Sequence, residues 1–378
     1  MNIKKVFFMT SFMGALALSA CGESPHVHTW GDITYTWSSD YSTCTAKRVC
    51  TIDESHVEEE TVNSTYQITT PETVTADGEG EYVATFTNSD FATQTHTVSI
   101  TKDLYAQRPH FGSSYKQVYY GLYPQTVVND SDIIAALNNL TSPESNGWYL
   151  YNGVYYAKHE GLPYDSDHTF DNGDTIVIGQ EYWFECQPIE WKVLSNTDNQ
   201  YYLLSTMLLN SKAFHSSRAE RTIDGKTIYP NNYMYSDIRA WLNGEFFNSA
   251  FALGNSNIQL TTVDNSAATT ANATNEYACD DTEDRVFLPS YQDYMNTSYG
   301  FIFPDYRRSA TTDFARACGV RVYTNSNFGE YHWTRSPYAE YAEHVKNIYF
   351  NGSFSDSGNR VDFVYNGVRP AIVVTIDK

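Results

Sequence analysis

The chain has 378 residues, and its 24 Lys and Arg residues against 45 Asp and Glu residues give a formal net charge of -21 at pH 7. This charge argues against a nucleic-acid partner, because binding to a polyanion depends on basic side chains that neutralise phosphates. With 41% hydrophobic and 18% charged residues the chain is too apolar to be disordered, and its length allows two or three domains. Beyond the N-terminus, no stretch approaches the ~20 apolar residues that a membrane-spanning helix needs.

Residues 1–20 have the layout of a secretory signal peptide, in which two lysines precede an apolar stretch and small residues follow. The segment ends in Leu18-Ser19-Ala20-Cys21, which resembles the bacterial lipobox. The resemblance implies that Cys21 is lipidated and becomes the first mature residue, with residues 21–25 as a tether. The alternative is an ordinary signal peptide with an incidental cysteine. We therefore expect the protein in the cell envelope, anchored to the membrane through the lipid on Cys21 and exposed at the surface.

Residues 26–102 predict a small all-β domain, because they are rich in Thr, Val, Tyr and Glu and contain short alternating segments such as 82–86 and 97–100. The unit resembles a short β repeat of gut-bacterial surface proteins, and the resemblance implies that it serves as a spacer. The residues that carry this resemblance are Trp30, Tyr35-Thr36-Trp37, Cys44 and Cys50.

The close pair Cys44 and Cys50 predicts a disulfide, since a small extracellular domain often needs a covalent link. A zinc site is the alternative, because two Cys and two His can bind this ion tetrahedrally. The spacings match no standard zinc pattern, so the prediction is a disulfide and no metal. The histidines that raise the zinc alternative are His26, His28 and His56, and the other cysteines are Cys186, Cys279 and Cys318.

A linker at residues 103–116 leads to a second region, residues 117–378, in which strands and helices alternate. Asp130 predicts the start of a helix, and Asn152-Gly153 predicts the turn of a hairpin. Residues 189–205 predict a second hairpin.

Further along the chain, three residues predict helix starts: Ser236, Ser290 and Thr312. The last 50 residues predict strands again, with tight turns at Asn351-Gly352 and Asn366-Gly367. The apolar run at residues 371–374 predicts a buried central strand.

Several fragments of the second region together resemble an uncharacterised family of bacterial extracellular domains. They are Tyr120-Gly121-Leu122-Tyr123-Pro124-Gln125, Pro188-Ile189-Glu190-Trp191-Lys192-Val193-Leu194, Ser236-Asp237-Ile238-Arg239-Ala240-Trp241-Leu242-Asn243, Asp284-Arg285-Val286-Phe287-Leu288, Trp333-Thr334-Arg335-Ser336-Pro337 and Gly367-Val368-Arg369-Pro370.

The closing Arg-Ser and Gly-x-Arg patterns are similar to the C-type-lectin-like fold of formylglycine-generating enzymes and bacterial variable receptors. The expected fold class is therefore α+β, with a C-type-lectin-like C-terminal domain preceded by a small all-β domain. The calcium-binding Glu-Pro-Asn and Gln-Pro-Asp triplets of sugar-binding lectins are missing, and so is the close cysteine pair of the copper-dependent oxidases. Neither activity is carried over.

Tyrosine is unusually frequent, with 31 residues, and several tyrosines lie in predicted loops. Tyrosine offers a rigid, half-polar contact surface at low entropic cost, which suits recognition of protein or glycan. The loop that contains Tyr229, Tyr233 and Tyr235 is the predicted ligand-binding patch. The alternative is that these tyrosines cover the core.

Arg335 and Arg369 occur in segments otherwise filled by apolar or small residues. We expect both to be buried and paired with acids such as Asp237 or Asp284, because a buried guanidinium without a partner is costly. The alternative is a clamp for a ligand carboxylate.

These patterns favour a cell-surface lipoprotein that presents a non-catalytic, adhesin-like module and needs no cofactor. No catalytic residue is predicted. One alternative is an envelope enzyme, either a thiol oxidase of the formylglycine-generating type or a hydrolase. A depressed pKa of Cys279 in a pocket would favour it. The other alternative is a structural envelope protein.

Overall fold

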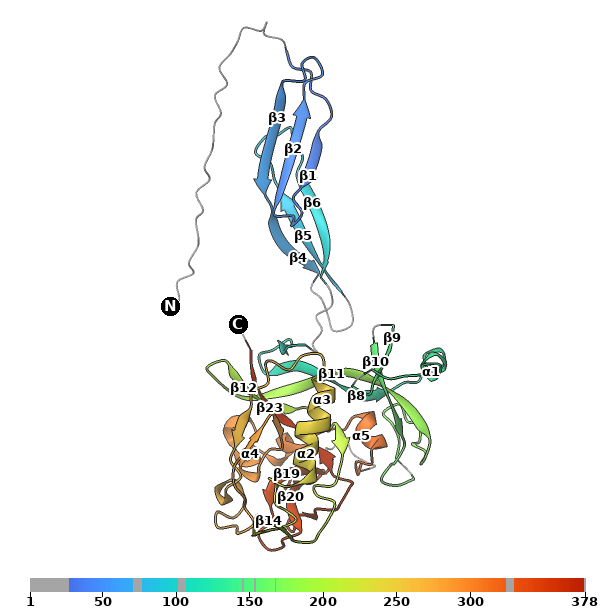
Figure 1. Cartoon of the computed structure of the whole chain (residues 1–378), viewed down its shortest axis with the longest axis vertical. Helices are drawn as coiled ribbons and strands as arrows, with labels where there is room; N and C mark the ends of the chain where they lie inside the picture. The colour runs from blue at the N-terminus through green and yellow to red at the C-terminus, as the bar shows by residue number, and fades with distance from the viewer. Residues whose placement is uncertain are drawn as a thin grey trace. The chain divides into compact units, whose positions relative to one another are not determined.

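The computed structural model describes residues 27–70, 77–100, 107–144, 146–152, 154–166, 168–323 and 330–376. The chain forms two compact units, Met1–Asp103 and Leu104–Lys378 (Figure 1). The predicted signal peptide, Cys21 and the tether lie outside the described residues.

The N-terminal unit contains two antiparallel sheets of three strands each. Their strands are β1 (Thr34–Trp37), β2 (Thr43–Val49), β3 (Val57–Asn63), β4 (Thr65–Thr70), β5 (Gly78–Ala84) and β6 (Gln94–Ile100). The buried core is small and consists of Cys44, Ala46, Ala84, Phe86 and Phe91. A core of this size supplies little stabilisation by itself, so such units commonly gain stability from a cross-link or a metal.

The predicted disulfide between Cys44 and Cys50 is wrong, because the two cysteines are not bonded to each other. Cys44 lies within β2 and Cys50 directly follows this strand, six positions away. An extended chain separates such residues by roughly 20 Å, whereas a disulfide needs Cα atoms within about 7 Å. Cys44 is fully buried in the core instead.

The C-terminal unit is built on an eight-stranded sheet, in which every pairing of neighbouring strands is antiparallel. Its longest strand, β11 (Glu181–Thr197), pairs with β10, β8 and β12 in turn. The other strands are β7 (His110–Phe111), β8 (Gln117–Val127), β9 (Tyr149–Tyr151), β10 (Val154–Glu160), β12 (Gln200–Ser205), β18 (Val286–Phe287) and β23 (Ala371–Thr375).

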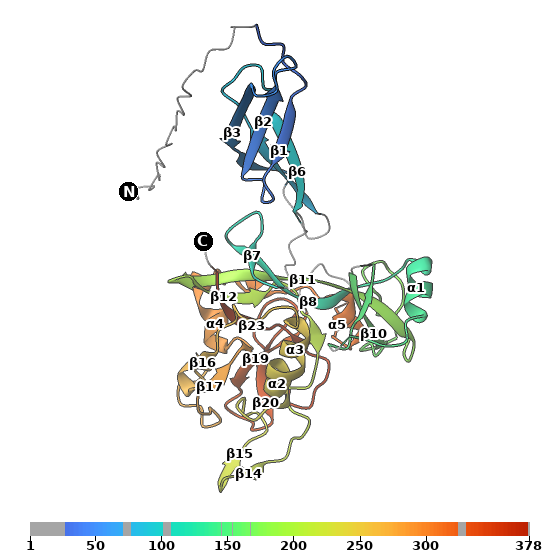
Figure 2. The ribbon, with the colours of Figure 1, turned by 45° about the horizontal axis from the view of Figure 1, so that its top comes forward.

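A second sheet of five strands has the order β13-β22-β19-β20-β21, and two small hairpins, β14–β15 and β16–β17, complete the strands (Figure 2). The bounds are β13 (Asn210–Ser211), β14 (Arg221–Ile223), β15 (Lys226–Ile228), β16 (Thr261–Val263), β17 (Thr282–Asp284), β19 (His332–Pro337), β20 (His344–Ile348), β21 (Asn359–Arg360) and β22 (Gly367–Val368).

The helices are short, and four of them begin at predicted capping residues. The side chains of Asp130, Ser236, Ser290 and Thr312 each accept a hydrogen bond from a backbone N–H of the first turn. The segments are α1 (Ser131–Asn138), α2 (Asp237–Trp241), the π-helix η1 (Leu242–Phe246), α3 (Phe247–Ala250), α4 (Tyr291–Met295), α5 (Asp313–Ala317), and the 3₁₀ turns η2 (Ala267–Thr269), η3 (Thr297–Tyr299) and η4 (Pro304–Arg307).

The predicted α+β, C-type-lectin-like fold class is wrong. Strand accounts for 39% of the structure and helix for only 13%, in a β-rich arrangement of several sheets. The capping residues do start helices, but most of these helices end within one or two turns, and the abundant Tyr, Val and Thr residues favour strands. The predicted turn at Asn366-Gly367 is also wrong, because Gly367 belongs to β22. The buried final strand is confirmed as β23, between β18 and β12.

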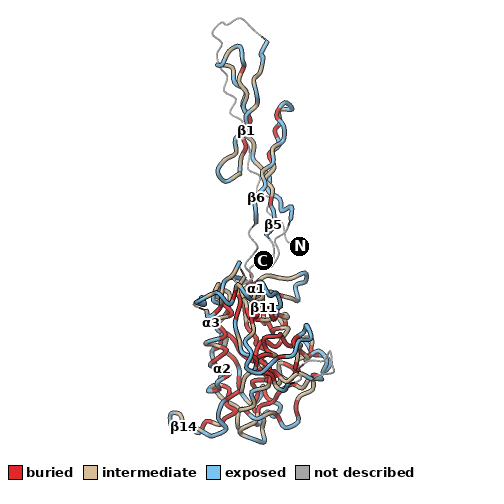
Figure 3. Tube along the Cα trace, turned by 90° about the vertical axis from the view of Figure 1, so that its right-hand side faces the viewer, coloured by how far each residue is buried: buried red, intermediate tan, exposed pale blue. Residues whose placement is uncertain are grey.

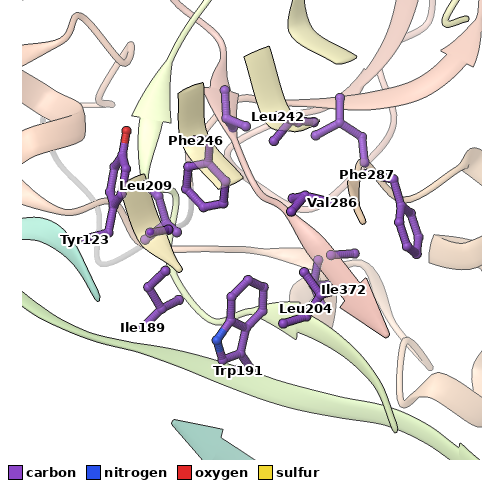
Figure 4. Packing of buried hydrophobic residues seen from close by; sticks show 14 of the residues in the cluster. Tyr123, Ile189, Trp191, Leu204, Leu209, Leu242, Phe246, Val286, Phe287 and Ile372 are labelled. Atoms are coloured by element: carbon purple, nitrogen blue, oxygen red, sulfur yellow. The ribbon is translucent and has the colours of Figure 1, made fainter. Parts of the chain in front are cut away.

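The core of the C-terminal unit lies between the large sheet and the helical segments, and buried residues fill the interior of this unit (Figure 3). Trp191, Leu204 and Ile372 from the sheet converge with Leu242 and Phe246 from the helical segment η1 (Figure 4). Trp191 is fully buried, and its Nε1 donates a hydrogen bond to the carbonyl oxygen of Tyr120 at 2.9 Å. The indole ring is therefore packed in the core, and its N–H group has a hydrogen-bond acceptor.

Two glycines with the same backbone conformation should respond differently to replacement by alanine. Gly352 has φ +78°, and a Cβ there would collide with the carbonyl oxygen of Pro304, whereas Gly225 has φ +76° and nothing within 4 Å. We expect Gly225→Ala to cost about 1–2 kcal/mol of unfolding free energy, from the left-handed backbone alone. Gly352→Ala should cost at least about 3 kcal/mol, because the clash adds to the same strain. Urea unfolding measures the free energy of unfolding of both variants. Equal losses in the two variants would contradict the close contact between Gly352 and the carbonyl oxygen of Pro304.

Candidate functional site

A cleft in the C-terminal unit consists of two adjoining cavities with volumes of about 440 and 650 Å³. Four residues line both cavities: Leu162, Ser211, Lys212 and Cys318. We call this feature the Lys212 cleft. The first cavity is also lined by Tyr123, Trp148, His159, Glu245 and Phe314, and the second by Asp237, Trp241 and Tyr365.

Lys212 follows β13 directly, and the surrounding hydrogen bonds hold its backbone in place. Trp333 Nε1 donates to the carbonyl oxygen of Lys212 at 2.8 Å, and the Ser211 hydroxyl donates to the carbonyl oxygen of Val364 at 2.8 Å. In addition, Asn210 pairs with Val368 in the register of β13 and β22. The position of the lysine is therefore set by two strands that are far apart in sequence.

The Lys212 ammonium is the positive charge that the two cavities share, whereas Lys158, the other lysine of the first cavity, pairs with Glu181 at 2.6 Å. The Nζ of Lys212 lies 4.9 Å from the centre of the Trp241 ring, which is within the range of a cation–π interaction. Among the residues that the structure describes, no carboxylate lies within 4.0 Å of this nitrogen. In a chain of net charge -21, this leaves a partly buried ammonium without an acidic partner.

Cys318 and His159 meet at the wall of the first cavity, with 3.7 Å between Sγ and Nε2. Desolvation raises the pKa of the Cys318 thiol to about 12, and the nearby Lys212 ammonium offsets only part of this effect. Burial also lowers the pKa of His159. At neutral pH the pair is therefore a protonated thiol beside a neutral imidazole, which is not the thiolate that nucleophilic catalysis needs.

The helical segment from Asp237 to Ala250 also lines the cleft. It is interrupted by the π-helix η1, which carries Glu245 and Phe246 into the first cavity. Such π-helical turns within α-helices occur frequently at functional sites. Glu245 gives the cleft an acceptor for hydroxyl groups in addition to the Lys212 donor.

The predicted tyrosine patch does not form a common surface. Tyr233 is only 1% exposed, and its hydroxyl accepts a hydrogen bond from the Leu288 N–H at 3.4 Å. Tyr229 is half-buried against Tyr277, with 4.8 Å between the ring centres, and Tyr235 is 37% exposed. The prediction of a three-tyrosine contact patch is wrong, because the segment buries its central ring in the core.

Arg335 is buried, and its acidic partner differs from those that the sequence suggested. Its Nη1 donates to Asp293 Oδ2 at 2.8 Å and to the carbonyl oxygen of Leu288 at 2.8 Å, while Nη2 donates to the carbonyl oxygen of Asp264 at 3.1 Å. Asp293 also belongs to the capping box of α4. The guanidinium therefore ties β19 to this helix.

Arg369 is also buried, and among the described residues no acid forms an ion pair with it. It donates to the carbonyl oxygens of Ser205 at 2.9 Å and Arg307 at 3.0 Å. The two acids named from the sequence have other partners, because Asp284 pairs with Arg239 at 2.7 Å and Asp237 with His215 at 3.0 Å. Neither buried arginine lines the Lys212 cleft.

Cys279 and Cys186 do not show the signature of a reactive thiol. Burial raises the pKa of Cys279, and it raises the pKa of Cys186 well above its usual range. The condition set for the enzyme alternative, a depressed pKa of Cys279, is therefore not met. Sequence reasoning missed Lys212 and His159 as cleft residues, because they lie in unrelated segments and form no motif.

Residues 199–376 match a family model described as a domain of unknown function (DUF6273). No curated protein and no solved structure matches the chain. The matched segment includes Lys212, Trp241, Glu245 and Cys318 of the cleft, whereas His159 precedes it. In the part of the chain that the structure describes, no helix is long and apolar enough to cross a membrane.

The protonated state of Cys318 can be measured by alkylation. With a pKa of about 12, its thiolate fraction at pH 7 is far below that of an ordinary cysteine. We expect iodoacetamide to label Cys318 in the native protein at least about 100-fold more slowly than in urea, as measured by peptide mass spectrometry. Native labelling at the unfolded rate would contradict this assignment and favour a thiol-dependent enzyme.

Proposed function

We propose that the protein is a lipid-anchored cell-surface protein whose C-terminal unit is a non-catalytic binding module. Its ligand would be a saccharide that carries a carboxylate, held in the Lys212 cleft. The observation that carries this proposal is the Lys212 ammonium, which lies over the Trp241 ring at 4.9 Å and lines both cavities.

The cleft carries charges of both signs, because Lys212 lines both cavities while Glu245 lines the first and Asp237 the second. A sugar acid suits this combination, since its carboxylate can pair with the lysine and its hydroxyls can donate to the acids. Among the described residues Lys212 forms no ion pair within 4.0 Å, so a ligand carboxylate that reaches it gains a strong, charge-assisted hydrogen bond. Glu245, in the same cleft, can accept hydrogen bonds from sugar hydroxyls. Because the chain as a whole is acidic, the proposal places the carboxylate of the ligand at Lys212, which lines both cavities.

The size and the walls of the cleft support the same ligand class. Volumes of about 440 and 650 Å³ are in the range of sites for small molecules. Trp148 lines the first cavity and Trp241 the second, and the exposed edge of a rigid ring there can pack against the apolar face of a sugar. Modest affinity at one site can be increased by many copies on a cell surface.

The anchor and the spacer complete the proposal. The lipobox-like motif at Cys21 supports attachment to a membrane, and the repeat-like N-terminal unit supports a role as a spacer between the membrane and the binding module.

A second candidate is a thiol-dependent enzyme, which the contact of 3.7 Å between Cys318 and His159 favours. The raised pKa of Cys318 and the lowered pKa of His159 oppose it, because both shifts stabilise the neutral forms.

The binding proposal predicts that Lys212→Gln lowers affinity for uronic- and sialic-acid glycans by at least about tenfold, because the charged partner is lost. Array screening of residues 22–378 with matched neutral glycans, followed by titration of the hits, measures this. Lys226→Gln is the control, since Lys226 is exposed on β15 in a separate hairpin.

Three outcomes would contradict this prediction. Equal binding of neutral glycans would mean that the carboxylate is not recognised. Equal losses in the two lysine variants would point to a general charge effect. Binding of acidic peptides alone would assign the cleft to another ligand class.

A further inference from the structure

A second group of chemically active side chains lies in the N-terminal unit. The ligand atoms of His28, Cys50 and His56 all lie within 4.8 Å of one another. His28 is exposed, Cys50 is buried and His56 is half-buried, so the group opens to solvent on one side. Two imidazoles and one thiol are the side chains that most often bind transition metals in proteins.

The backbone holds Cys50 and His56 close together. They are the two ends of the loop that follows β2, and the Cys50 N–H donates to the carbonyl oxygen of His56 at 2.9 Å. Inside the loop, the His56 N–H donates to the carbonyl oxygen of Asp53 at 3.0 Å. The distance between these two side chains therefore follows from a closed turn.

His28 reaches the same place because its segment runs beside Cys50. Trp30 and Cys50 form an antiparallel bridge, and the Thr51 N–H donates to the carbonyl oxygen of Thr29 at 2.8 Å. The rings of His28 and His56 have centres 4.8 Å apart and are nearly perpendicular, at 81°. Three short segments thus bring their side chains to one point.

We propose that His28, Cys50 and His56 bind a divalent cation of the zinc class. Zinc bonds of about 2.0 Å to nitrogen and 2.3 Å to sulfur place tetrahedral ligand atoms roughly 3.3 to 3.8 Å apart. The ligand atoms would therefore move up to about 1.5 Å closer together, by side-chain rotation, when the ion binds. On binding, the Cys50 thiol releases its proton to solvent and each histidine ligates through a neutral nitrogen. A water molecule can complete the tetrahedron.

The surrounding charges are compatible with a cation. Asp53 Oδ2 lies 3.8 Å from His56 Nε2, where a carboxylate can orient a ligating imidazole. Arg48 approaches the neighbouring Trp30 ring, but its charge is balanced by Glu58 at 2.5 Å and Asp90 at 2.6 Å.

The metal would provide the cross-link that the sequence suggested in the form of a disulfide. It would join the segment before β1 to the loop between β2 and β3, in a unit with a small buried core. Because the three ligands are held together only in the folded chain, the binding free energy adds to the stability of this unit.

The test uses residues 22–378, which lack Cys21. The protein is first treated with chelator to remove any bound metal. Competition with a colorimetric chelator measures zinc, and cobalt reports the ligands through its thiolate charge-transfer and tetrahedral bands. We expect one ion per chain and a charge-transfer band. His28→Ala, Cys50→Ser and His56→Ala should each weaken binding by about 100-fold or more, and Cys50→Ser should also abolish the band.

Matched controls are Cys44→Ala in the core and His96→Ala on β6, which should keep zinc affinity within about threefold of the parent chain. Circular dichroism reports whether each variant folds. His28 is exposed, so its variant stays informative even if Cys50→Ser unfolds. A folded parent chain that binds no stoichiometric ion overturns the proposal. So does cobalt binding without a thiolate band, or equal losses in the controls.

Discussion

The C-terminal unit depends on the pairing of one long strand with three others. The 17 residues of β11 contact β10 at one end, β8 along the middle and β12 at the other end. The strand contains Pro188, which donates no hydrogen bond, and the register with β8 shifts beside it. Gln125 Nε2 stabilises this irregular place by donating to the carbonyl oxygens of Gln187 and Pro188. Trp191, four residues beyond Gln187, then fixes the core against the same sheet.

Buried arginines complete the connection between the sheets and the short helices. Arg335 links β19 to α4 through Asp293, and Arg369 joins the carbonyl oxygens of Ser205 and Arg307 across the junction of β22 and β23. Both guanidiniums have their hydrogen bonds directed inward and neither lines the cleft, so they stabilise packing, whereas Lys212 lines both cavities. The binding proposal and the architecture are therefore consistent with each other.

In the N-terminal unit, the sequence and the structure assign different roles to Cys44 and Cys50. In the sequence, Cys44 and Cys50 are near neighbours, which favours a disulfide. In the structure, an extended strand directs Cys44 into the core and places Cys50 beside His28 and His56. A thiol that is buried among apolar groups has a packing role, whereas a thiol beside two imidazoles has ligand chemistry. The difference comes from strand geometry alone.

Local features were determined by the sequence itself. Asp130, Ser236, Ser290 and Thr312 start helices because capping needs only a side-chain oxygen and the next few N–H groups. The fold class was not determined in this way, because helix length and sheet order depend on contacts between distant segments. The same holds for the cleft, where Lys212, His159 and Cys318 come from separate elements, and for the burial of Tyr233. Only tertiary packing brings such residues together, since no local pattern records which distant segment a strand will pair with.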